Sequence, residues 1–208
     1  MNGSSVLVVA TLQALRDFLD HVSADAGREL ASIEERALAG SFSAYESYEA
    51  ELGVPLVRLE IGVRAVQYEL VALVEKELHT LAYGPWLSSN HKGPKTIYDL
   101  NKINSGSLST LKSVSDLNFN EIKKLIETHY GLTLSALPTW AKIAALREVV
   151  NSFKHRQGFL RPRDVDWANG SWTQRHQPSP EDAYAQIDAA DAFLKELRLE
   201  ISKGKTAA

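Results

Sequence analysis

The 208-residue chain has no cysteine and only one methionine, and none of its apolar runs approaches the ~18 residues that a membrane-spanning helix needs. Without cysteine the chain has no disulfide bonds and no thiolate metal ligands, which fits a reducing compartment. The apolar run at residues 6–10 is short, and no basic residue precedes it, so we do not expect a secretory signal. These absences predict a soluble, cytoplasmic protein without a membrane span.

Recognisable cofactor and metal motifs are also missing. The chain carries no phosphate-binding glycine loop, and its histidines lack the spacing of zinc ligands. We therefore expect no metal site and no cofactor.

The charge is small in total but uneven along the chain. The net charge is −3, yet residues 1–80 hold 13 acidic and 6 basic residues, and residues 81–208 hold 13 acidic and 17 basic residues. Six basic residues and a single acidic one fall between Lys142 and Arg163. Such a cluster attracts polyanions, because neutralising phosphates releases condensed counterions. It also fits a solvated helix face whose charge is balanced elsewhere in the fold.

Apolar residues recur at helical spacing over most of the chain, and strand-like alternation is almost absent. This pattern predicts an all-α fold, an antiparallel bundle of about five to six helices in a single domain over residues 1–208. The expected helices cover residues 12–22, 25–50, 55–84, 118–130 and 138–157, with a last one after Ser179. A long irregular excursion is expected near residues 84–117, and a loop over residues 158–178.

Individual residues set the expected helix boundaries. Pro55 suits the first turn of one helix, and Pro180 after Ser179 suits the start of the last. Gly131 is expected to end the helix before it.

The helix at residues 138–157 carries the most informative pattern. On a helical wheel its buried side holds Ile143, Leu146, Val149, Val150 and Phe153. Arg147, Asn151 and His155 are four residues apart and form one row at the border of that side. A guanidinium, an amide and an imidazole in one row suit phosphate binding and proton transfer. The alternative is that the cations at residues 154–156 only complement the helix macrodipole.

The stretch "LREVVNSFKHRQG" at residues 146–158 resembles the signature helix of the HEPN superfamily. These are small α-helical bundles common in toxin–antitoxin and phage-defence systems. Asn151, Lys154, His155 and Gly158 match one version of the signature. The stretch "YELVALVEKEL" at residues 68–78 is similar to the acidic-aliphatic helix that packs early in such bundles. The chain departs from the usual pattern because Val150 stands where an Arg normally precedes Asn151.

The resemblance implies an RNA- or nucleotide-engaging protein and a metal-independent ribonuclease reaction. His155 would transfer the proton, Arg147 would offset phosphate charge, and Asn151 would orient the substrate. The expected RNA contacts are Lys154, Arg156, Arg161 and Arg163. The resemblance also implies a homodimer, with an antitoxin or a nucleotidyltransferase as a further partner.

A second interpretation belongs to another functional class. In it the chain is a noncatalytic α-helical interaction protein whose 138–157 helix only packs and dimerises. Because Val150 stands in place of the usual Arg, the sequence does not decide between a ribonuclease and a noncatalytic interaction protein.

Overall fold

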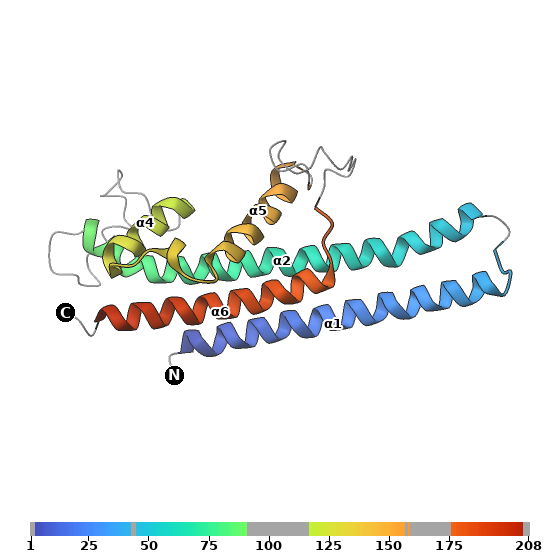
Figure 1. Ribbon diagram of the computed structural model, residues 1–208, viewed down its shortest axis with the longest axis horizontal. Coiled ribbons are helices and arrows are strands. Elements are labelled where there is room, and N and C mark those ends of the chain that lie inside the picture. Colours follow the sequence, from blue (N-terminus) through green and yellow to red (C-terminus); the bar gives the residue numbers. More distant parts are fainter. Residues whose placement is uncertain (1–2, 43–44, 91–116, 157, 159–175, 206–208) are drawn as a thin grey trace, which may run out of the picture. The chain divides into compact units, whose positions relative to one another are not determined.

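The computed structural model describes residues 3–42, 45–90, 117–156, 158 and 176–205, and within them every regular element is helical (Figure 1). The elements are α1 (Gly3–Leu38), α2 (Tyr45–Asn90), α4 (Phe119–Tyr130), the 3-10 turn η2 (Leu134–Ala136), α5 (Trp140–Arg156) and α6 (Pro180–Lys205). The predicted all-α helical bundle is confirmed. Within it the chain divides into two compact units, residues 1–72 with 139–193, and residues 73–138 with 194–208.

Helix α1 is one continuous helix, so the prediction of separate helices at residues 12–22 and 25–50 is wrong. Four of its buried side chains recur every seven residues, the spacing with which two long helices pack together. They are Leu12, Leu19, Ala26 and Ile33. Gly27 lies mid-helix in open space, where a glycine costs only about 1 kcal/mol relative to alanine. The chain turns instead at Gly40, whose φ is 69°.

Helix α2 also exceeds its predicted limits. Pro55 lies ten residues inside the helix rather than in its first turn, and the helix runs on to Asn90, past its predicted end near residue 84. An internal proline costs a hydrogen bond and about 3 kcal/mol. The burial of a long apolar side offsets this cost, and it includes Val63, Val66 and Leu70 as predicted. The rest of the predicted excursion, residues 91–116, lies outside the described residues.

The first unit packs α1, the first part of α2, α5 and the first part of α6. Leu19, Val63, Ile143 and Phe193 are buried in it, and the Trp140 ring lies 6.0 Å from the Phe193 ring. Polar contacts that join its helices include Arg16 with Asp188, Tyr184 with Asp20, and Gln67 with Gln186.

The second unit contains the remainder of α2, α4, η2 and the end of α6. Leu78, Ile122 and Leu134 form part of its core. Asn118 caps α4 in a capping box with Glu121, and Gly131 ends α4 with a φ of 64°, as predicted. In the first unit, the start of α6 also follows the prediction, because the Ser179 hydroxyl accepts from the Asp182 backbone N–H at 3.1 Å.

Candidate functional site on helix α5

Helix α5 lies where the sequence places it, and its apolar side anchors it in the first unit. Ile143, Leu146 and Val150 are buried, as predicted. Val149 and Phe153, which were expected on the buried side, are only half-buried. Ser152 is fully buried instead, and its hydroxyl donates to the Val149 carbonyl at 2.6 Å. The internal hydrogen bond explains why a serine is tolerated there.

A tight cap fixes the last turn of α5. Gly158 has a φ of 84°, and its N–H donates to the Ser152 carbonyl at 2.9 Å, six residues back. A φ of this sign lies in the left-handed region, which glycine adopts readily and in which many helices end. The Gly158 carbonyl in turn accepts from the His176 N–H at 2.9 Å. The predicted glycine end of the helix is therefore confirmed.

The three predicted catalytic residues share one row of α5, named here the α5 row. Arg147 and Asn151 are half-buried and His155 is exposed. Neighbouring members are about 6 Å apart along the axis, so Arg147 and His155 are about 12 Å apart. Helical side chains all tilt toward the N-terminus, so the tilt does not bring the members of the row together. One copy of the chain therefore places Arg147 and His155 at opposite ends of the row, with Asn151 between them.

Lys154 and Arg64 join α5 to α2 through aromatic rings. The Lys154 ammonium lies 5.4 Å from the centre of the Tyr68 ring, and the Arg64 guanidinium lies 4.3 Å from the centre of the Phe153 ring. Each helix therefore offers a cation to an aromatic ring of the other, and each such contact contributes roughly 0.5–2 kcal/mol. Sequence reasoning missed Arg64 and Tyr68, because no local pattern links them to residues more than eighty positions away.

Arg156 is engaged within its own helix. Its guanidinium lies 2.6 Å from a carboxylate oxygen of Glu148, two turns earlier. Both side chains are partly buried, so the pair offsets much of the Arg156 charge locally. Of the other predicted RNA contacts, Arg161 and Arg163 lie outside the described residues. The ion pair with Glu148 therefore lowers the positive charge that Arg156 offers at the end of α5.

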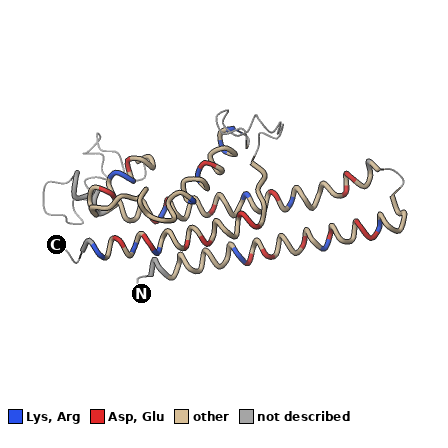
Figure 2. The backbone as a smooth tube through the Cα atoms, viewed as in Figure 1, with Lys and Arg blue, Asp and Glu red and all other residues tan. Residues whose placement is uncertain are grey.

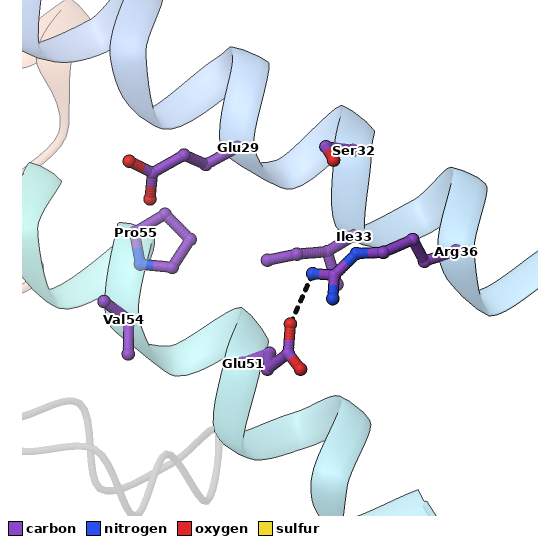
Figure 3. Close-up of a pocket in the computed structure, with 7 residues that line it drawn as sticks. All are labelled: Glu29, Ser32, Ile33, Arg36, Glu51, Val54 and Pro55. Atoms are coloured by element: carbon purple, nitrogen blue, oxygen red, sulfur yellow. Dashed lines mark hydrogen bonds and ion pairs between the residues drawn. The ribbon is translucent and has the colours of Figure 1, made fainter. Parts of the chain in front are cut away.

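A hollow of about 310 Å³ lies away from α5, between α1 and α2 (Figure 3). Ile33, Val54 and Pro55 form its apolar part. Arg36 and Glu51 form an ion pair at one end of it. No local sequence pattern predicts this hollow, because it arises where a compact proline ring faces the other helix.

In the part of the chain that the structure describes, no three histidine or carboxylate side chains lie close enough together to hold a metal ion. None of the helices described combines the length and the apolar character needed to cross a membrane.

Comparison with known proteins adds no identity. No family model matches the chain, and neither a curated protein nor a solved structure is similar enough to it to match.

Proposed function

We propose that the chain engages RNA or a nucleotide through the α5 row. The main support is the position of the row along the edge of a firmly packed helix, with Val150 buried beside Asn151 and His155 exposed. Packing fixes the backbone beneath the row, while the imidazole reaches solvent. An amide and an imidazole one turn apart offer two hydrogen-bond donors to a phosphate oxygen. Arg147 adds a positive charge one turn further along.

The finer proposal is metal-independent RNA cleavage by a homodimer. A neutral His155 accepts the proton of a ribose 2′-hydroxyl, the freed oxygen attacks the adjacent phosphorus, and the bond to the 5′-oxygen breaks. A protonated His155 of a second copy supplies the proton that the leaving 5′-oxygen needs. Arg147 of either copy offsets the added charge on the phosphate. The second copy matters, because Arg147 and His155 of one helix tilt the same way and do not converge.

This finer proposal places the chain in the cytoplasm, in a toxin–antitoxin or phage-defence setting. An antitoxin or a nucleotidyltransferase would be its partner there. The setting follows from the resemblance of the α5 signature to the HEPN superfamily, and its support is the match of Asn151, Lys154, His155 and Gly158.

Binding of labelled single-stranded RNA, followed by fluorescence anisotropy, tests the proposal. His155→Ala should weaken binding about tenfold, the effect of losing one charge-assisted hydrogen bond. His21→Ala is the matched control, because His21 is also an exposed helical histidine, on α1. Equal affinities of the two variants would contradict the proposal. Cleavage is tested separately with an excess of chelator, where wild type should cut RNA and His155→Ala should not.

The second candidate function is a noncatalytic α-helical interaction protein. The contacts of two expected RNA-binding residues favour it, since Arg156 pairs with Glu148 and Lys154 lies over Tyr68. In this function α5 is a packing helix. His155→Ala would then leave RNA affinity unchanged, and wild-type protein would leave RNA intact.

A further inference from the structure

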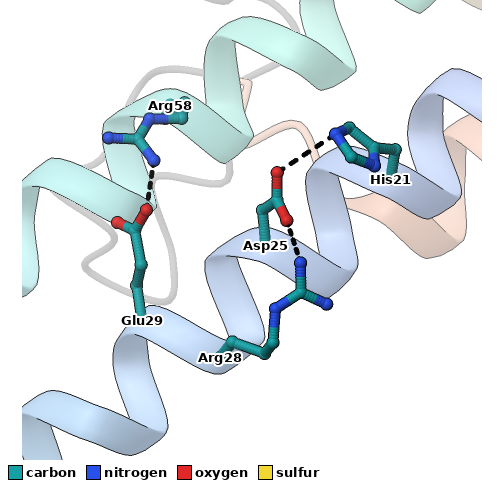
Figure 4. Close-up of polar contacts among 5 residues, drawn as sticks. All are labelled: His21, Asp25, Arg28, Glu29 and Arg58. Atoms are coloured by element: carbon teal, nitrogen blue, oxygen red, sulfur yellow. Dashed lines mark hydrogen bonds and ion pairs between the residues drawn. The ribbon is translucent and has the colours of Figure 1, made fainter.

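The distal halves of α1 and α2 form a two-helix projection, named here the hairpin arm (residues 24–38 and 45–61). In Figure 1 the arm runs on past the start of α6, so among the described elements only α1 and α2 cover each other there. Arg58 pairs with Glu29, and Arg36 pairs with Glu51, each across the two helices (Figures 3 and 4). Figure 4 also shows Asp25 engaged along α1 by His21 and Arg28.

One side of the arm exposes aliphatic side chains in a regular row. Val54, Val57 and Ile61 are 56%, 54% and 60% exposed, and we name them the α2 row. Their spacing of three and then four residues is the spacing of a helix–helix seam. Single exposed aliphatic residues need no explanation, but three in a seam mark a contact surface.

The hollow of about 310 Å³ adjoins this row, because Val54 belongs to both. Ile33 and Pro55 provide further apolar wall, and the charged residues around it, Glu29 and Arg36, already hold partners within the arm. An incoming charged group would have to compete with these ion pairs. The hollow therefore suits one apolar side chain projecting from a partner.

The charge of the arm indicates which partner fits. The described residues of the arm include eight acidic and three basic residues, a net charge of −5 (Figure 2). Two arms would repel each other, which disfavours a second copy of this surface as the occupant. A basic helix would be attracted and would gain association rate from the same charge.

We propose that the hairpin arm docks a basic amphipathic helix of a partner protein, with the apolar side of that helix along the α2 row and one of its aliphatic side chains in the hollow. The proposal does not depend on the α5 row. That row lies on helix α5, whereas the hairpin arm is formed by α1 and α2 alone. Three half-exposed side chains amount to much less than the ~800 Å² that each partner buries in a standard interface. The contact is therefore of the weak, reversible kind, with affinity in roughly the micromolar range.

The test uses the full chain and a labelled helical peptide of about three heptads, with leucine in the seam and lysine on the other faces. The control peptide has the same leucine seam, with glutamate in place of lysine. Wild type should bind the lysine peptide and bind the glutamate peptide at least about tenfold more weakly. Val57→Asn with Ile61→Asn should weaken binding of the lysine peptide by about tenfold or more.

The matched variant is Val6→Asn with Val9→Asn, which removes two equally exposed aliphatic residues of α1 outside the arm and should bind like wild type. Circular dichroism checks that both variants stay helical. Equal binding by the two variants, or equal binding of both peptides, overturns the proposal. So does a wild-type dimer that the Val57 and Ile61 substitutions dissociate, because the surface would then serve self-association.

Discussion

Replacing Gly158 by alanine should destabilise the first unit more than replacing any other left-handed glycine of the described chain. Its φ of 84° costs an L-residue about 1–2 kcal/mol. The new Cβ would also lie 2.6 Å from Cε1 and 2.9 Å from Cδ1 of Phe153, closer than carbon atoms pack. Overpacking of this kind costs typically about 1–3 kcal/mol.

The Phe153 ring cannot shift without loss, because the Arg64 guanidinium lies 4.3 Å from its centre. We therefore expect a total cost of about 3 kcal/mol and a fall in Tm of roughly 6–12 °C. Gly131→Ala provides the control, since Gly131 has a φ of 64° but no atom within 4 Å of the added Cβ. That variant should lose only the backbone part, about 1–2 kcal/mol.

Thermal unfolding followed by circular dichroism measures both variants. Adding Phe153→Leu to Gly158→Ala should relieve the contact, so the double variant should be less destabilised than the sum of the single ones. If Gly158→Ala costs no more than Gly131→Ala, the packing of Phe153 against the α5 cap is wrong.

Three further predictions concern the long helices. Gly27→Ala should raise the free energy of unfolding by up to about 1 kcal/mol, since Gly27 is helical with open space around it. Gly62→Ala should lower Tm, because the added Cβ would lie 2.8 Å from Cγ1 of Val22. If urea unfolding gives Gly62→Ala a free energy of unfolding equal to or higher than that of Gly27→Ala, this packing is refuted. Arg198→Met should cost about 1–3 kcal/mol, because it removes a 2.9 Å contact from the carboxylate of Glu77, which is 8% exposed. A loss of less than roughly 0.5 kcal/mol in the free energy of unfolding is typical of a surface ion pair, and it would contradict the burial of the Glu77 carboxylate.

Periodicity predicted the all-α class and the helices after residue 117 well. Local signals there agree with one another, as at Gly131, which ends α4, and at Ser179, whose hydroxyl caps α6. The boundaries of α1 and α2 failed for the opposite reason. Pro55 signals a helix start and Gly27 weakens a helix, but the packing of two long helices outweighs both local costs.

The candidate site shows the same division. The spacing of Arg147, Asn151 and His155 predicted their shared row, because a single helix fixes it. The contacts of Lys154 with Tyr68 and of Phe153 with Arg64 depend on which helix lies beside α5. That information is absent from any local stretch of sequence. The α2 row was overlooked because its residues resemble ordinary core positions, and only their exposure distinguishes them.

The most direct test of the proposed α5 site is an NMR titration of the histidine ring signals with a short single-stranded RNA. The chain has six histidines, and the variants His155→Ala and His21→Ala assign two of them. We predict that the His155 ring signals shift with added RNA in proportion to binding, while those of His21 stay in place. Unmoved His155 signals, or equal shifts of His21, would contradict phosphate binding by the α5 row.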